Sequence, residues 1–100
     1  MAKVDKLSAA IEGLNVIFFS YNGGLRSVQP YELGKSIAGI TLLRGYQTGG
    51  YSSRGRSTGW KLFRVAGISG LEVQAETFLP RGSYFSLPSF WTKDLINWVA

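Results

Sequence analysis

The hydrophobic pattern at the start of the chain is that of an amphipathic helix. Apolar side chains recur there at spacings of three and four, at Val4, Leu7, Ile11 and Leu14. Positions with this spacing share one side of a helix, so residues 3–14 are predicted to be helical. The apolar stripe is expected to pack on a sheet.

Beyond this helix the pattern changes to short segments rich in β-branched and aromatic residues. Residues 16–21 and 25–28 flank an Asn-Gly-Gly sequence at 22–24, which predicts a hairpin because these residues accept positive φ. Pro30 is expected to end regular pairing, since it cannot donate to a ladder. Residues 31–36 are therefore expected to form a loop or an edge segment.

Three further strands are predicted at 37–47, 60–65 and 71–74. A flexible connection rich in Gly, Ser and Arg over 48–59 and a turn over 67–70 separate them. A helix followed by about five short strands predicts a mainly β fold, either a small barrel or a strongly bent sheet. Closure into a barrel would remove the exposed edges of the sheet.

The C-terminal segment is less regular, because Pro80 and Pro88 interrupt it. Trp91, Leu95 and Trp98 recur at helical spacing, which indicates a short terminal helix. A length of 100 residues is that of one domain. This domain is expected to comprise an N-terminal helix (1–15), a barrel (16–78) and a C-terminal extension (79–100).

Composition excludes several kinds of chemistry. The chain has no cysteine and no histidine, so it lacks thiolate nucleophiles, disulfides, the usual general base and the commonest metal ligands. Glu72 and Glu76 are close enough in sequence to suggest a glycosidase-type pair or a magnesium-dependent nuclease. Nothing else resembles a sugar cleft, and the local pattern indicates strand and loop rather than the helix on which their spacing would help. We therefore expect a protein that is not an enzyme and holds no cofactor. No segment has the roughly 20 apolar residues that span a bilayer, and the start lacks a signal-peptide core, so a cytoplasmic location is expected.

The positive charge is concentrated in the middle of the chain. No acidic residue lies between Glu32 and Glu72, and the net charge is +5. The basic residues of that stretch are Lys35, Arg44, Arg54, Arg56, Lys61 and Arg64. They are interleaved with aromatic residues and glycines, which favours an anionic partner such as nucleic acid over a merely solvated surface.

The loop between the strands at 37–47 and 60–65 offers groups for binding an anion. It contains no Gly-Lys-Ser/Thr sequence and leads into a strand, so it is neither a Walker loop nor a dinucleotide fingerprint. Its glycines allow backbone N–H groups to approach an anion, and its arginines can contact phosphate in bidentate fashion. Tyr46, Trp60 and Phe63 lie nearby and could stack on bases.

Several segments in order carry a resemblance to a known family. They are Ile17-Phe18-Phe19-Ser20-Tyr21, Arg26-Ser27-Val28-Gln29-Pro30-Tyr31, Leu43-Arg44-Gly45-Tyr46-Gln47, Gly49-Gly50, Ser53-Arg54-Gly55, Gly59-Trp60-Lys61-Leu62-Phe63, Ile68-Ser69-Gly70-Leu71, Thr77-Phe78 and Pro80-Arg81-Gly82-Ser83-Tyr84. Over about residues 7–84 the sequence thereby resembles the WYL-domain family, in its small stand-alone members without a helix-turn-helix domain. The name-giving Trp-Tyr-Leu triplet is Thr41-Leu42-Leu43 here, and Gln29 stands where the family often has histidine.

The resemblance implies a Sm-like or SH3-like β-barrel that acts as a ligand-sensing regulatory module. Relatives are linked to transcription control, DNA-damage responses and phage or CRISPR defence, which implies a bacterial or phage source. The implied ligand is single-stranded nucleic acid or a nucleotide-like molecule. The binding residues carried over by position are Tyr21, Arg26, Gln29, Arg44, Gln47, Arg54, Trp60 and Phe63.

Each candidate also has a structural interpretation. Tyr21 and Phe63 could be core residues, Trp60 could cap a barrel end, and Gln47 could satisfy buried backbone groups. Arg26 and Arg44 lie in predicted strands with few acids nearby, which favours a ligand-facing role because a charge there needs a partner. Arg54 and Arg56 are expected to be exposed in their loop.

Two functions follow from these observations. The leading hypothesis is a non-catalytic binding module whose positive cleft combines Arg26, Arg44, Arg54, Arg56 and Lys61 with the stacking surfaces of Tyr46, Trp60 and Phe63. The alternative is an accessory subunit that docks on a larger protein of transcription, phage or CRISPR-type machinery. Its contact residues would be the aromatic-rich set Phe85, Phe90, Trp91, Leu95 and Trp98. That set could instead pack on its own barrel, and homodimerisation stays open.

Overall fold

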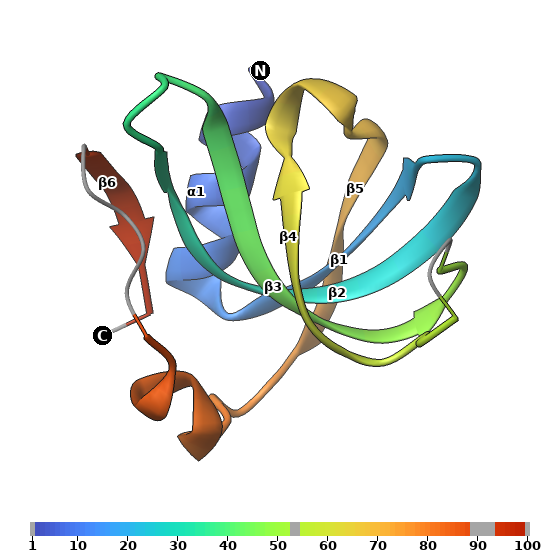
Figure 1. Ribbon diagram of the computed structural model, residues 1–100. Coiled ribbons are helices and arrows are strands. Elements are labelled where there is room, and N and C mark those ends of the chain that lie inside the picture. The colour runs from blue at the N-terminus through green and yellow to red at the C-terminus, as the bar shows by residue number, and fades with distance from the viewer. Residues whose placement is uncertain (1, 53–54, 89–93, 100) are drawn as a thin grey trace.

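The computed structural model describes residues 2–52, 55–88 and 94–99, with only the backbone of residue 94, and its elements are mainly β (Figure 1). Within these ranges it contains helix α1 (Lys3–Gly13) and two short 3-10 segments, η1 (Val65–Gly67) and η2 (Gly82–Ser86). The strands are β1 (Asn15–Tyr21), β2 (Gly24–Lys35), β3 (Thr41–Gly50), β4 (Gly59–Arg64), β5 (Ser69–Thr77) and β6 (Asp94–Trp98). In the described ranges no helix is both long and apolar enough to cross a membrane.

Helix α1 confirms the predicted N-terminal helix. Leu7, Ala10 and Ile11 are buried, as their spacing on one side requires. The helix ends where Leu14 adopts a left-handed conformation and its N–H bonds to the Ile11 carbonyl. Its buried side faces the concave side of the sheet.

The strands form a single antiparallel sheet in the order β4-β3-β2-β1-β5, and β6 pairs with β2. The predicted hairpin between β1 and β2 is confirmed. Asn22 and Gly23 have φ of 47° and 94°, which is the left-handed backbone that their residue types favour. The sheet is strongly curved (Figure 1), but no pairing joins β4 to β5 among the described residues. A closed Sm-like or SH3-like barrel therefore stays a prediction.

The expectation that Pro30 ends pairing is wrong. Strand β2 continues to Lys35, with Pro30 opposite Gly45 and a bulge between Pro30 and Glu32. A bulge accommodates a residue without an N–H donor, so the ladder resumes beyond it. The predicted loop at 31–36 is consequently mostly strand, and the following strand begins at Thr41 rather than at residue 37 because 36–40 form a turn.

The predicted C-terminal helix is also wrong for the described residues. Residues 94–98 form β6, which pairs with the second half of β2, where Leu33 lies opposite Asn97. Strand β1 pairs only with the first half of β2, so the edge beyond it is free to accept another strand. The backbone hydrogen bonds gained there outweigh a helical spacing of only three apolar residues, one of which, Trp91, lies outside the described residues.

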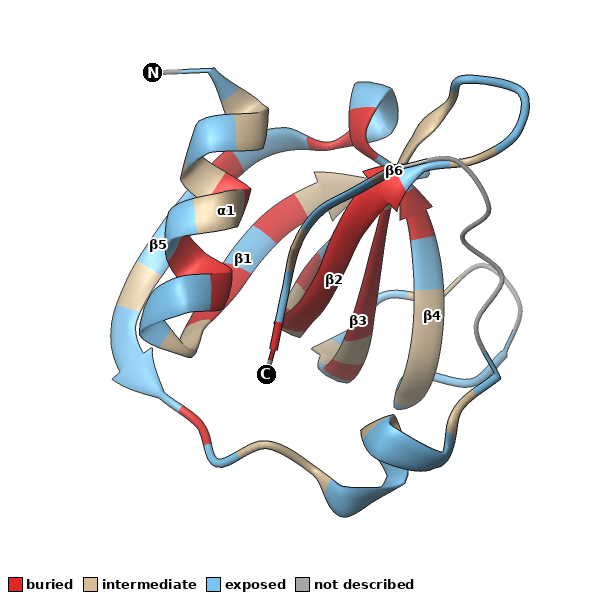
Figure 2. Ribbon diagram, turned by 90° about the vertical axis from the view of Figure 1, so that its left-hand side faces the viewer, coloured by how far each residue is buried: buried red, intermediate tan, exposed pale blue. Residues whose placement is uncertain are grey.

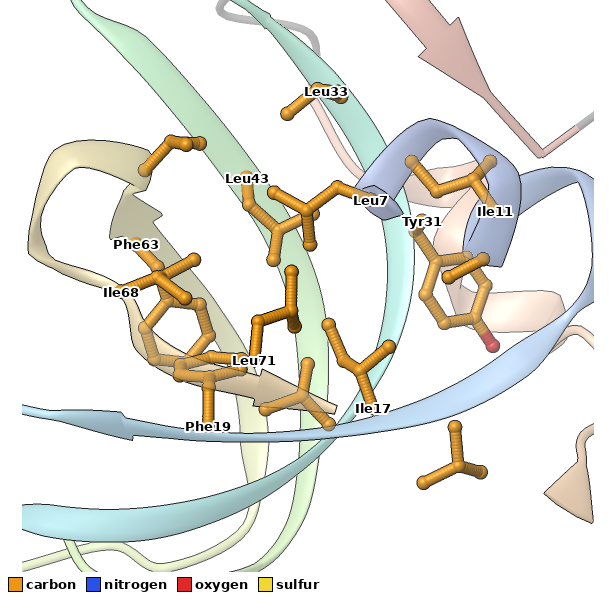
Figure 3. Packing of buried hydrophobic residues seen from close by; sticks show 14 of the residues in the cluster. Leu7, Ile11, Ile17, Phe19, Tyr31, Leu33, Leu43, Phe63, Ile68 and Leu71 are labelled. Carbon is orange, nitrogen blue, oxygen red and sulfur yellow. The ribbon is translucent and has the colours of Figure 1, made fainter. Parts of the chain in front are cut away.

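One core lies between α1 and the concave face of the sheet. Buried positions concentrate on β2 and β3 and on the side of α1 that faces them (Figure 2). Figure 3 shows side chains from α1, β1, β3 and β4 converging there, among them Leu7, Ile17, Leu43 and Phe63. Phe19 and Phe63 meet edge to face with centroids 5.0 Å apart.

Candidate anion-binding site

Strand alternation divides the predicted binding residues between two faces of the sheet. On β3, Gln47 shares the core-facing side with Leu43, whereas Arg44 and Tyr46 point to the opposite side. Register extends this division: Tyr46 lies beside Gln29 on β2 and beside Trp60 on β4. The structure therefore does not bring the predicted residues into a single cleft.

The core-facing group is built around Arg26. This side chain is only 5% exposed, and it lies opposite Phe19 in β1 and Gly50 in β3. Its Nη1 donates to the Gln47 Oε1 at 3.3 Å, and its Nη2 donates to the Tyr21 carbonyl at 3.1 Å. Its buried Nε has no hydrogen-bond partner, and no described carboxylate forms an ion pair with it. The guanidinium is thus a buried cation without a counter-charge in the described chain.

Aromatic rings surround this cation. The guanidinium carbon lies 5.3 Å, 5.5 Å and 5.7 Å from the ring centroids of Tyr21, Tyr51 and Phe63, respectively. Tyr21 and Phe63 also pack edge to face at 5.0 Å, which holds both rings in place. Each ring face attracts the cation weakly, so the cage orients Arg26 without neutralising it.

A pocket opens beside Arg26 at the gap between β4 and the β1–β2 hairpin. Its volume is about 330 Å³. We call it the Arg26 pocket, and its lining residues are Tyr21, Asn22, Arg26, Ser52, Lys61, Leu62 and Phe63. Lys61 brings a second cation and is tethered by its Nζ to the Arg56 carbonyl at 2.9 Å and to the Ser52 hydroxyl at 3.3 Å. The pocket therefore combines two positive groups, a hydroxyl, an amide and aromatic walls.

Gln47 has a positioning role in this arrangement. It is fully buried, accepts from Arg26, and donates through Nε2 to the Tyr51 carbonyl at 2.9 Å. Its amide thereby links the cation to the segment after β3. The sequence also suggested that Gln47 satisfies buried backbone groups, and its hydrogen bond to the Tyr51 carbonyl is a contact of that kind.

On the opposite face the C-terminal extension covers the other predicted residues. The Arg81 guanidinium lies 3.7 Å from the Tyr46 ring centroid, and its Nε donates to the Gln29 Oε1 at 3.0 Å. The Trp60 indole N–H donates to the Ser83 hydroxyl at 3.3 Å. Gln29, Tyr46 and Trp60 thus contact the chain itself.

Arg44 has an acidic partner, contrary to the sequence expectation. It lies directly opposite Glu32 and forms a buried ion pair with it at 3.1 Å, while its Nη2 donates to the Pro88 carbonyl at 2.9 Å. Tyr84 lies beside this pair, and burial, followed by the Glu32 carboxylate, raises the pKa of Tyr84 to about 12. These contacts fasten the extension to the sheet.

The remaining candidate residues lie away from the Arg26 pocket or outside the described residues. The Arg56 side chain is exposed, and Arg54 lies outside the described residues. Glu72 and Glu76 are exposed on strand β5, where a spacing of four residues separates their Cα atoms by about 13 Å. Glycosidases hold their two carboxyl groups about 5–9.5 Å apart, and an extended backbone does not bring this pair together as a helix would.

Sequence reasoning missed three residues of the Arg26 pocket. They are Asn22 in the hairpin turn, Ser52 after β3 and Leu62 on β4; Tyr51, whose ring lies over Arg26, was missed as well. Gly50, with φ of 97° and with the Leu25 carbonyl in the space that a Cβ would need, turns the chain there and brings Tyr51 over Arg26. The adjacent Gly49-Gly50 pair was the available signal for such a turn.

Comparison with known proteins finds one informative likeness. No protein-family model matches the chain, and no curated protein matches it. The solved structure of proteasome accessory factor B/C (PafBC) of Arthrobacter aurescens is similar, with 26% sequence identity and a TM-score of 0.64. The likeness covers 80% of this chain and 13% of the PafBC chain. Because PafBC contains a WYL domain, the likeness supports a WYL-related fold for this chain.

Proposed function

We propose that this protein is a non-catalytic regulatory module that binds a nucleotide-like anion, either free or within a single strand of nucleic acid, in the Arg26 pocket. The likeness to an accessory factor is consistent with a regulatory module. The proposal assigns contact roles to Arg26 and Lys61 and a stacking role to Tyr21, whereas Phe63, which is 1% exposed, packs in the core and holds the Tyr21 ring in place.

The observation that carries the proposal is the buried, uncompensated charge of Arg26. Removing a guanidinium from water costs several kcal/mol unless an opposite charge and full hydrogen bonding compensate. In the described chain Arg26 has two hydrogen bonds and no acid, although a guanidinium carries five N–H donors. A phosphate oxygen in the Arg26 pocket would supply both the charge and the missing acceptors.

The shape of the pocket supports a compact ligand. About 330 Å³ is at the lower end of the range for small-molecule sites, and the half-buried Tyr21 ring in its wall offers stacking for a base. A strand of nucleic acid would place one nucleotide in the pocket and lay its neighbours over Arg56 and Arg64, whose side chains are exposed.

Fluorescence anisotropy tests the proposal. A labelled short single-stranded DNA and the matching RNA are titrated with protein at two salt concentrations, and unlabelled mononucleotides and inorganic pyrophosphate serve as competitors. We expect binding that weakens with salt and that the competitors displace, because counterion release and the Arg26 contact both depend on the phosphate. Absence of binding to strands and mononucleotides alike at low salt would refute it.

A second candidate function, docking on a larger protein, rests on exposed apolar residues of the C-terminal region. Phe85 is 61% exposed, and Leu95 and Trp98 on β6 are 42% and 49% exposed. Phe90 and Trp91 lie outside the described residues. The test is a paired substitution, Leu95→Ser with Trp98→Ser, analysed by sedimentation: a folded variant that loses self-association or capture by its partner supports docking or a homodimer, and unchanged behaviour refutes both.

A further inference from the structure

At the gap in the sheet, strand β4 presents backbone groups that no described residue pairs with. The Arg64 N–H donates to the Tyr21 hydroxyl at 2.9 Å, so it points away from β3. Alternation along an antiparallel strand turns the N–H and C=O of Leu62 toward the same side. No described residue bonds to these two Leu62 groups, and the Leu62 side chain is 44% exposed.

Pockets lie on both sides of this edge. On the core-facing side, Leu62 borders the Arg26 pocket. On the other side is a pocket of about 350 Å³, which we call the Pro88 pocket. Its lining residues are Arg44, Trp60, Lys61, Leu62, Leu87 and Pro88. The Pro88 pocket is mainly apolar, whereas the Arg26 pocket is positively charged.

This arrangement matches the side-chain alternation of an added strand. Consecutive residues of an extended peptide point to opposite faces, so one residue would enter the Arg26 pocket and the next the Pro88 pocket. No acidic residue is among the described residues that line either pocket. Lys61 and the buried Arg26 therefore favour an acidic side chain on the core-facing side, and Trp60, Leu87 and Pro88 favour an apolar one opposite.

We propose that the β4 edge at Leu62 binds an extended segment of a partner protein in which acidic and apolar side chains alternate. The segment pairs its backbone with Leu62, directs a carboxylate to Arg26 and Lys61, and inserts an apolar side chain into the Pro88 pocket. This surface is separate from the exposed residues of β6. It extends beyond the proposed function, and the two ligands exclude each other because both place an anion at Arg26.

The probe is a capped, fluorescein-labelled peptide in which Asp and Leu alternate. Control peptides alternate Ser with Leu or Asp with Ser, and a fourth peptide is the Asp/Leu sequence with N-methylated backbone amides. We expect the Asp/Leu peptide to bind at least tenfold more tightly than each control. Loss of binding on N-methylation would show that the peptide pairs through its backbone amides, because binding by side-chain contacts alone does not need those N–H groups.

Two variants at one position separate the backbone from the side chain. Leu62→Pro removes the outward N–H while leaving the ladder to β3, since proline is tolerated where the N–H of an edge strand faces solvent. Leu62→Ala removes a similar part of the side chain but keeps the N–H. We expect the peptide to bind Leu62→Pro about tenfold more weakly than Leu62→Ala, as loss of one hydrogen bond predicts.

The results of these experiments distinguish failure of strand addition at β4 from failure of the proposed anion binding. Equal peptide affinity for the two variants, equal affinity of the N-methylated peptide, or no peptide binding to the wild-type protein would overturn strand addition. Thermal unfolding of both variants establishes that each is folded, and should Leu62→Pro fail to fold, the N-methylated peptide gives the same decision on the wild-type protein. Displacement of labelled single strands by pyrophosphate, measured separately, tests the proposed function, so its failure is distinguishable from failure at β4.

Discussion

Replacement of Arg26 by methionine should separate stability from binding. Methionine retains the length and most of the apolar contacts of the arginine stem but removes the charge. The variant loses hydrogen bonds from Arg26 to Gln47 and to the Tyr21 carbonyl, each worth about 1.5–3 kcal/mol for a charged donor. It also loses the attraction of three rings, which contributes about 0.5–1 kcal/mol per contact.

The opposing effect is the release of a buried charge. Several kcal/mol of desolvation cost disappear with the guanidinium, because no described carboxylate offsets that cost. The two contributions are similar in size, so we expect the free energy of unfolding to change by no more than about 2 kcal/mol. Anion binding should respond differently, since loss of a buried charged contact costs about 2 kcal/mol or more, or about thirtyfold in affinity.

Urea unfolding measures the first quantity, and anisotropy competition with pyrophosphate measures the second. Pyrophosphate should also raise the Tm of the wild-type protein but not that of Arg26→Met. Arg56→Met is the matched control, because the Arg56 side chain is exposed and its substitution should alter affinity only slightly. A large loss of stability in Arg26→Met together with unchanged binding would refute the reasoning, since it would make Arg26 purely structural.

Three further predictions concern the Arg44–Glu32 ion pair, the Tyr84 hydroxyl and the turn at Gly50. Arg44→Met should lower the free energy of unfolding in urea by about 3–5 kcal/mol, because it removes the ion-pair partner of the buried Glu32 carboxylate. Adding Glu32→Leu should restore part of that loss, and additive losses of the two substitutions would contradict the ion pair. The folded-state pKa of Tyr84, about 12, lies above the ordinary value of 10.0, so the neutral Tyr84 hydroxyl contributes fully to the free energy of unfolding below pH 10, and this contribution is lost as pH rises toward 12. Tm measured at alkaline pH should therefore decline less steeply for Tyr84→Phe than for the wild-type protein, and identical declines would contradict the assignment. Gly50→Ala should destabilise by about 1–3 kcal/mol and weaken anion binding, because φ is 97° and the added Cβ would meet the Leu25 carbonyl; an unchanged Tm would show that the turn tolerates a side chain.

The parts of the fold that were predictable from sequence depend on neighbouring residues. Helix α1 follows from a stripe whose members lie within one segment, and the β1–β2 hairpin follows from the residue types at Asn22 and Gly23. In both cases local geometry and burial act in the same direction. The segments that were predicted wrongly, 31–36 and 94–98, pair with each other across more than half of the chain. No local pattern specifies such a pairing, and a bulge at Pro30 is required before it can form.

The same distinction applies to the candidate site. The residue types that form the Arg26 pocket were largely predictable, since arginine, lysine and aromatic residues are concentrated in an acid-poor stretch. Their division between two faces was not, because it depends on register. A register shift between Ser27 and Val28 places Gln47 beside Val28 and within reach of Arg26, and no pattern in the sequence locates that shift.

The two buried arginines show how register separates a structural residue from a candidate binding residue. Arg26 and Arg44 are alike in sequence, since each lies within a strand, and each is 5% exposed in the structure. Arg44 faces Glu32 across the β2–β3 ladder, so its charge is compensated within the protein and fastens the C-terminal extension. Arg26 faces Phe19 and Gly50, which offer no charge, and a pocket opens beside it. Because a buried cation without a described counter-charge is costly, the cross-strand neighbour determines which arginine holds the fold together and which one is the candidate for binding an anion.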